Sequence, residues 1–175
     1  MDWSPVLISV KTALVSIGFT FFLGLWAARR VVRLKSEKAK GLIDGIFTLP
    51  MALPPTVAGF FLLYIFGTKR PVGILLQQVF SCKIVFTWQA AVIAAVVISF
   101  PLMYRSARGA IEQVDQNLVY AARTFGMKER TIFWKVIFPE AKPGILAGGI
   151  LAFTRGLGEF GATAMIAGNI AGKTR

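Results

Sequence analysis

The sequence has no histidine, one cysteine and only eight acidic residues among its 175 residues. Histidine is the commonest general base and metal ligand, so its absence removes the usual acid–base chemistry and most metal sites. A single cysteine, Cys82, excludes an intrachain disulfide, and we expect an inert thiol there. No paired carboxylates, metal-ligand spacing or catalytic triad can be found. The sequence therefore predicts a chain that is not an enzyme and that holds no metal or cofactor of its own.

Long apolar runs fill most of the chain, which is 55% hydrophobic, against about 45–50% in soluble domains. A helix needs about 20 apolar residues to cross a bilayer. Four stretches approach that length: 5–28, 45–66, 84–104 and 143–166. The first is too long for a cleavable signal peptide and is followed by two arginines. The sequence predicts an all-α integral membrane fold, in which residues 1–175 form one transmembrane domain of about four spanning helices.

Basic residues outnumber acidic ones by 20 to 8, for a net charge of +12. They lie in blocks between apolar runs and not on one face of a soluble domain, which disfavours a nucleic-acid binder. Residues 29–42 hold six and residues 105–142 hold seven, whereas 67–83 hold three and the C-terminal tail two. Because basic loops stay in the cytoplasm, the first two regions are predicted to be cytoplasmic and the N-terminus to lie outside.

The second apolar stretch is interrupted by Pro50, Pro54 and Pro55. Proline removes a backbone donor and clashes with the preceding helical turn. In a membrane, such a break is tolerated where protein or a water-filled cavity satisfies the freed backbone groups. Broken helices of this kind often line transport pathways. The sequence leaves two interpretations open, a purely structural kink or a lining of a pathway.

The fourth apolar stretch carries two charges, Arg155 and Glu159, four positions apart on one helix face. Unpaired charges are costly in a membrane, so we expect the two to pair. The pair either fixes the helix internally or contributes to a path or gate. Small residues also recur at every fourth position and allow close packing, within the subunit or at a dimer interface: Gly144, Gly148, Ala152 and Gly156.

The segment 115–139 is polar and helix-forming, although it lies between apolar stretches. Asp115 is the candidate N-cap of a first helix, and Gly126 ends that helix because glycine tolerates a left-handed conformation. A second helix is predicted from about Lys128 to Pro139. The predicted apolar faces are Leu118, Ala121, Ala122 and Phe125, then Ile132, Phe133 and Val136. The hairpin either lies on the membrane surface or is a knob gripped by a soluble partner.

Residues 120–139 resemble the "EAA" signature of ABC-importer permeases, which reads EAA, three residues, Gly, nine residues, Ile, one residue and Leu-Pro. Ala121, Ala122, Gly126 and Pro139 match it, and Tyr120 replaces its glutamate. In that family the element is a cytoplasmic coupling helix that docks on the ATPase subunit. The resemblance therefore implies that 115–139 is a coupling segment whose contacts with the ATPase come from Ala121, Ala122, Gly126, Met127 and Pro139.

Three runs are similar to the molybdate/tungstate ABC transporter permeases, a subfamily of the type I importers. They are LPMALPPTVAGFFLL, IVFTWQAAVIAAVVISFPLMYRSARGA and LAFTRGLGEFGATAMIAGNIAGKTR. Sulfate permeases carry a similar Leu-Gly-Glu-Phe-Gly stretch and are the nearest alternative. Permeases of this type continue past Arg175 into about one more transmembrane segment, so the resemblance implies that this chain lacks that segment.

The resemblance implies a transmembrane subunit in a prokaryotic cytoplasmic membrane. Its implied partners are a second permease copy, a cytoplasmic ABC ATPase that binds ATP and Mg²⁺, an external oxyanion-binding protein and the lipid bilayer. A tetrahedral oxyanion could be held by hydroxyl and backbone N–H groups at a broken helix end. The candidate path or gate residues are Pro54, Pro55, Thr56, Arg155 and Glu159.

Residues 167–174 fit a relaxed phosphate-loop pattern ending in Gly-Lys-Thr. A phosphate loop opens a helix, and only one residue follows here, so we expect no nucleotide site in this chain. A secondary transporter or channel subunit would need ion-coupling carboxylates in its spans, and Glu159 is the one available. A small membrane enzyme would need clustered histidines, cysteines or carboxylates at one membrane face, and the sequence has none.

Overall fold

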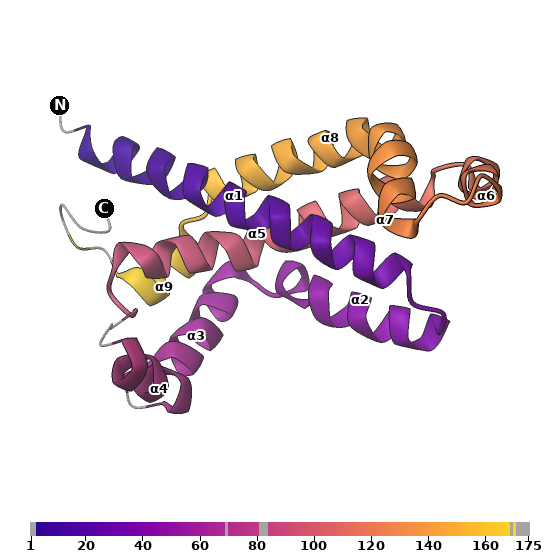
Figure 1. The fold of residues 1–175 in the computed structure, drawn as a ribbon. Helices are drawn as coiled ribbons and strands as arrows, with labels where there is room; N and C mark the ends of the chain where they lie inside the picture. The colour runs from indigo at the N-terminus through magenta and orange to yellow at the C-terminus, as the bar shows by residue number, and fades with distance from the viewer. Residues whose placement is uncertain (1–2, 69, 81–83, 169, 171–175) are drawn as a thin grey trace.

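The computed structural model describes residues 3–68, 70–80, 84–168 and 170, so Cys82 and most of 167–174 lie outside the described residues. Figure 1 shows a long helical bundle, and the described residues include no strand. The predicted all-α fold is confirmed. The helices are α1 (Ser4–Val32), α2 (Glu37–Ala52), α3 (Pro55–Phe66), α4 (Pro71–Phe80), α5 (Trp88–Glu112), α6 (Gln116–Thr124), α7 (Glu129–Ile132), α8 (Phe138–Leu157) and α9 (Gly161–Ala167).

Three helical segments of the described chain are long and apolar enough to cross a bilayer: Val6–Val32, Trp88–Glu112 and Glu129–Leu157. The pair α2 and α3 gives a fourth crossing if it counts as one span, although its two halves are bent by 111°. The number of spans thus agrees with the predicted four. The first and third predicted spans are unbroken helices, and the second is the broken helix that its prolines indicate.

The bend between α2 and α3 follows from two successive prolines. Leu53 and Pro54 each precede a proline and both have extended backbone, with ψ of 144° and 138°. A residue before proline is pushed out of the helical region by the proline ring. Pro55 then starts α3, where a missing N–H costs nothing. Pro50 lies inside α2 without ending it.

The prediction of one continuous helix over residues 143–166 is wrong. Helix α8 ends at Leu157, and a separate short helix, α9, begins at Gly161. The Glu159 side chain explains the second start, because its Oε1 accepts a hydrogen bond of 2.7 Å from the backbone N–H of Ala162. A carboxylate in this position satisfies a donor that a helix leaves unpaired at its first turn.

The prediction that Pro139 ends a helix is also wrong. Helix α7 continues through a π-helical turn, Phe133–Ile137, directly into α8, and Pro139 lies in the first turn of α8. The N–H of Phe138 bonds to the carbonyl of Phe133, five residues back. This wider turn gives room where a proline ring would otherwise clash with the carbonyl four residues earlier. The helix therefore passes Pro139 without a break.

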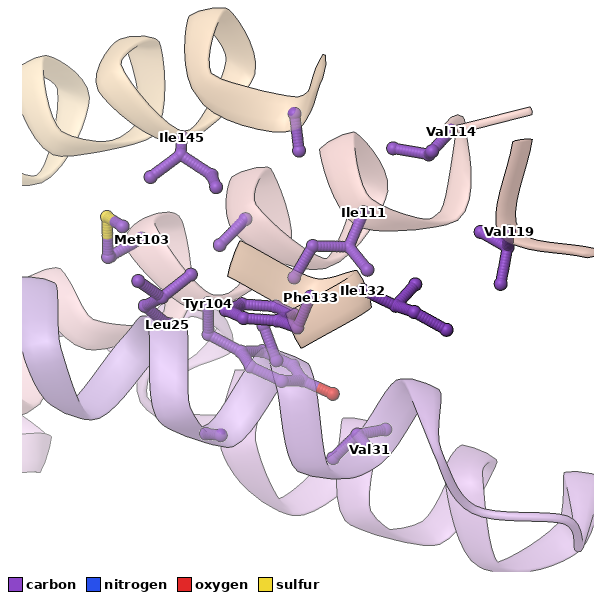
Figure 2. Close-up of a cluster of buried hydrophobic side chains, with 14 of the residues drawn as sticks. Leu25, Val31, Met103, Tyr104, Ile111, Val114, Val119, Ile132, Phe133 and Ile145 are labelled. Carbon is purple, nitrogen blue, oxygen red and sulfur yellow. The ribbon is translucent and has the colours of Figure 1, made fainter. Parts of the chain in front are cut away.

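Helix α5 forms the centre of the bundle, between α1 and α8 (Figure 1). Its small side chains, including Ala90, Ala94 and Ala107, are fully buried, which lets neighbouring backbones approach closely. A Cβ at Gly148 of α8 would lie 2.5 Å from the Cβ of Ser106. The small-residue face of α8 therefore packs within the subunit, against α5. Figure 2 shows the larger side chains of the core gathered from α1, α5, α6, α7 and α8.

A polar contact joins α2 to the central helix. The Tyr104 hydroxyl donates a 2.5 Å hydrogen bond to Asp44, and Arg108 forms an ion pair with the same carboxylate. The Phe47 ring lies edge-on to Tyr104, with 5.1 Å between the ring centroids. Asp44 thus has two partners on α5, which compensate for holding a carboxylate against an apolar bundle.

The close approach of α8 to α5 gives a test of the packing. We expect Gly148→Ala to lower the free energy of unfolding by about 1–3 kcal/mol, as for other overpacked sites, because the new methyl group would overlap Ser106. The matched control is Gly149→Ala, where a Cβ would lie 3.4 Å from the Phe21 ring, an ordinary contact. Thermal unfolding of the detergent-purified protein, followed by tryptophan fluorescence, measures both. Equal shifts for the two variants would contradict the packing.

Candidate functional site

The segment α6–α7 projects from one end of the bundle, and the N-terminus and α9 lie at the other end (Figure 1). The first helix of this hairpin begins as predicted at Asp115, whose side chain accepts a 2.9 Å hydrogen bond from the N–H of Asn117. Such an N-cap satisfies one of the free donors at the start of a helix. The polar segment of the sequence is thus a structured element and not a loose linker.

The turn of the hairpin is a left-handed helix cap at Gly126, with φ of +72°. The N–H of Met127 bonds to the carbonyl of Ala122 at 3.2 Å, and the N–H of Gly126 bonds to that of Arg123 at 2.9 Å. This pair of bonds is the Schellman arrangement, in which glycine is favoured because it has no Cβ. The prediction that Gly126 ends the first helix is confirmed. Helix α7 follows at Glu129, with Lys128 as its N-cap residue.

Only one edge of α6 contacts the bundle. Val119 and Ala122 are buried with Ile132 and Phe133 of the following helix, in the core that Figure 2 shows. Of the predicted apolar face, Leu118, Ala121 and Phe125 are exposed and Ala122 is buried. The apolar stripe of α6 is wider than the surface that the bundle offers, so most of it stays uncovered.

The uncovered part of the stripe leaves apolar side chains exposed at the tip of the hairpin. Phe125 is 85% exposed, Leu118 47% and Met127 of the turn 37%, and Tyr120, on another side of α6, is 57% exposed. Exposed apolar patches bordered by polar residues typically mark interaction surfaces. Among the predicted coupling residues, Ala121, Gly126 and Met127 are on this exposed part, Ala122 points inward, and Pro139 lies apart on α8.

An ion pair ties the two helices of the hairpin together. The Arg123 Nε donates to Glu129 Oε1 at 2.7 Å, and Arg123 Nη2 lies 3.4 Å from Glu129 Oε2. The hydrogen bond and the negative charge of Glu129 raise the pKa of Arg123, so this pair stays charged at neutral pH. A cleft of about 410 Å³ lies behind the hairpin, and Arg33, just after α1, and Val114, just after α5, also line it.

The two helix breaks meet in space inside the bundle, away from the hairpin (Figure 1), and Gly156 near the end of α8 faces Ser16 and Ser99 in the middle parts of α1 and α5. A methyl group added to Gly161, the first residue of α9, would lie 3.1 Å from the Cβ of Pro55 and 3.4 Å from the backbone nitrogen of Thr56. At Gly59, one turn further along α3, it would lie 2.6 Å from the Cα of Ala162. The start of α3 therefore rests on the start of α9, and Thr56 is exposed beside this contact.

Arg155 and Glu159 form the predicted pair, with 2.6 Å between Arg155 Nη1 and Glu159 Oε2. The Glu159 side chain is 1% exposed and that of Arg155 is 33% exposed. Because Glu159 also accepts the N–H of Ala162, one carboxylate holds the end of α8 to the start of α9. A small cavity of about 40 Å³ borders Glu159, with Ser9 and Thr12 of α1 on its other side. The structure thus brings the predicted path residues of both breaks into one region of the bundle.

Two features of these regions were not predicted. The exposure of Phe125 does not follow from its place on the apolar face, because sequence spacing gives no sign of which part of a short apolar stripe will be covered. The Asp44 contacts with Tyr104 and Arg108 cross 60 or more positions of sequence. A carboxylate at the edge of an apolar run was the available signal, since such a group needs a partner.

Comparisons with known proteins place the chain in a family. Residues 20–174 match the family described as "Binding-protein-dependent transport system inner membrane component". The molybdenum transport system permease protein ModB of Escherichia coli strain K12 is 41% identical over 174 residues, which cover 99% of this chain and 76% of that protein. The sulfate transport system permease protein CysT of Salmonella typhimurium is 36% identical over 167 residues, or 95% of this chain and 60% of that protein.

The fold also matches a solved structure, an inward-facing conformation of the MetNI methionine ABC transporter. The match has a TM-score of 0.70 and covers 94% of this chain and 74% of the other, at 21% sequence identity. At that identity it supports the fold alone, and the fold is that of a type I ABC importer permease. Together with the family match over residues 20–174, it shows that the chain belongs to the family of inner membrane permease components of binding-protein-dependent transport systems.

Proposed function

We propose that this permease subunit imports molybdate or tungstate across a prokaryotic cytoplasmic membrane, driven by ATP. The observation that carries the proposal is the 41% identity with a molybdenum transport system permease, which extends over 99% of the chain. ATP with Mg²⁺ would be bound and hydrolysed by a separate ATPase subunit. An external oxyanion-binding protein would deliver the anion to a homodimer of the permease.

The exposed tip of the α6–α7 hairpin is the proposed docking surface for the ATPase. It combines a large exposed aromatic side chain, Phe125, with a glycine turn and an ion pair that fix its shape. Interfaces of this kind depend on a few aromatic anchors that enter pockets of the partner. The membrane-surface alternative is less favourable, because the hairpin extends from the end of the bundle (Figure 1).

The proposed transport step follows from this attachment. Closure of the ATPase pair would pull two hairpins together, and each hairpin is continuous with its bundle through α7 and the π-helical turn into α8. The bundles would then rock and open the path toward the loaded binding protein. Such a change requires that ATP and the binding protein each favour a different state.

The region where the two helix breaks meet is the proposed path or gate. Pro54, Pro55 and Thr56 start α3 beside α9, and the pair of Arg155 and Glu159 holds α8 to α9. Short helices that end in the membrane present free backbone groups to a passing anion. The exposed Thr56 adds a hydroxyl there.

Sulfate is the alternative substrate, because the sulfate permease CysT matches 95% of the chain at 36% identity. A secondary transporter subunit is less well supported. Its ion-coupling carboxylate would have to be Glu159, which is already paired with Arg155, and the family is one of binding-protein-dependent systems.

The docking proposal predicts that Phe125→Ser and Gly126→Pro reduce co-purification with the ATPase. Loss of an aromatic anchor should weaken the complex by about thirtyfold, and proline cannot adopt the positive φ of Gly126. Leu42→Ser is the matched control, because Leu42 is also strongly exposed, at 68%, but lies on α2. Equal ATPase recovery with all three variants, together with unchanged melting of the permease, would reject this surface.

The substrate proposal predicts uptake of molybdate and not of sulfate. The gene would be expressed with its ATPase and binding protein in cells that lack their own molybdate and sulfate importers. Accumulation of each anion is then measured against cells without the permease. Uptake of sulfate alone would show that the anion assignment is wrong.

The proposal that the two helix breaks form a path or gate predicts two effects of Glu159→Gln. The amide oxygen can still accept the Ala162 N–H, but Arg155 loses its counter-charge, so we expect a loss of about 1–3 kcal/mol in unfolding free energy. This loss is smaller than the usual cost of removing one partner of a fully buried ion pair, because Arg155 is partly exposed. Uptake per assembled transporter should fall as well. The control is Glu112→Gln, at a more exposed pair with Arg108. Uptake that falls only in proportion to folded protein would leave the pair a purely structural role.

A further inference from the structure

Four arginines gather at one end of α1 and the start of α7: Arg29, Arg30, Arg33 and Arg130. We call them the arginine cluster. The charges of the other three all act on Arg29, so the cluster repels itself. Within the described part of the chain none of the four forms an ion pair; the ion pairs there use other basic residues. The positive charge of Arg33 acts on Glu129, but both carboxylate oxygens of Glu129 accept hydrogen bonds from Arg123.

Arg29 is the member of the cluster whose charge and hydrogen-bond donors are least compensated in the described structure. Its guanidinium lies 3.9 Å from the centroid of the Phe133 ring, which fixes the plane of the group. Its Nε is buried and has no hydrogen-bond partner in the described structure. A buried donor of a charged group without a partner is unfavourable. An oxyanion bound to the accessible part of the guanidinium would supply the negative charge that this group lacks.

Exposed indole rings lie next to the cluster. Trp26 is 57% exposed, and the Arg30 guanidinium lies 5.1 Å from its ring. Trp134 is 49% exposed and packs on Phe133, with 5.2 Å between the ring centroids. Tryptophan side chains gather at the level of the lipid headgroups in membrane proteins. The cluster also lies at the end of the span Val6–Val32, so the level of the headgroups is where the structure places it.

An apolar groove lies further along α1, about two helical turns from the cluster. It has a volume of about 220 Å³ and lies between α1 and α5; its lining residues are Phe19, Leu23, Val92, Ile93, Val96 and Val97. Phe19 and Leu23 share one face of α1 with Trp26 and Arg30, at helical spacings of four, three and four. From Arg30 to Phe19 the helix rises about 16 Å, close to half the thickness of a bilayer core, about 15 Å.

We propose that the arginine cluster and this groove form a binding site for one anionic phospholipid. The headgroup phosphate would bind the guanidinium groups of Arg29 and its neighbours, and an acyl chain would lie along Leu23 and Phe19. The cationic end alone would suit any phosphate, but the apolar groove on the face of α1 that also carries Trp26 and Arg30 fits a lipid. The site rests on the membrane fold and does not depend on the identity of the transported anion.

The test is lipid retention by the purified transporter, measured by native mass spectrometry. The protein is equilibrated in detergent with equal amounts of dioleoyl phosphatidylglycerol and dioleoyl phosphatidylcholine. We expect the wild type to retain phosphatidylglycerol preferentially. The double variant Arg29→Gln/Arg130→Gln should reduce that retention by roughly thirtyfold, from the loss of two cations at an anionic headgroup.

The matched control is Lys35→Gln/Lys38→Gln, which removes the same charge from exposed positions at the α1–α2 turn and should retain the lipid. Arg130→Gln alone, at an exposed side chain, keeps the test valid if the double variant fails to fold. Equal retention by both double variants, or equal retention of the two lipids by the wild type, would overturn the proposal. So would displacement by inorganic phosphate as effective as displacement by dioleoyl phosphatidylglycerol, since the site would then serve a soluble anion.

Discussion

The architecture depends on how closely helix backbones can approach the central helix α5. Between helices in lipid there is no hydrophobic driving force comparable to that in water, so packing over small side chains must hold them. Alanines of α5 are buried on several sides, Gly24 of α1 lies against Met103, and Gly148 of α8 lies against Ser106. A buried hydrogen bond of 3.0 Å between Thr20 and Ser99 adds a polar contact to the same interface. The three long helices thus form one unit.

Helix interruptions occur in two regions of this unit, and the candidate functional regions coincide with them. At one end of the bundle, Gly126 turns α6 back toward α7 and leaves Phe125 uncovered. Inside the bundle, Pro54 and Gly158 separate short helices from long ones. An ion pair spans the hairpin turn and another the end of α8: Arg123 with Glu129, and Arg155 with Glu159. Forces applied at the hairpin can therefore reach the inner breaks through continuous helix, from α7 to α8.

Local sequence signals predicted most of the fold. Apolar length predicted the spans, the Pro54-Pro55 pair predicted a broken helix, and Asp115 and Gly126 predicted the limits of α6. The errors arose where a distant contact decides the outcome. Glu159 starts a new helix because its carboxylate reaches Ala162, and Pro139 is tolerated because the preceding turn widens. The candidate path residues were predicted as separate groups; that Thr56 and Gly161 lie together depends on tertiary packing.

The π-helical turn at Phe133–Ile137 sets the angular phase between two surfaces of one continuous helix. Ile132 and Phe133 before it anchor the hairpin, and Gly144 and Gly148 after it face α5. Each residue of an α-helix advances the direction of its side chains by about 100°. A single-residue deletion in the α-helical part between this turn and Gly144 would therefore aim larger side chains of α8 at α5 while leaving the hairpin unchanged. Natural variation in this segment should be restricted to substitutions, because the number of its residues fixes how the hairpin is oriented relative to the face of α8 that packs on α5.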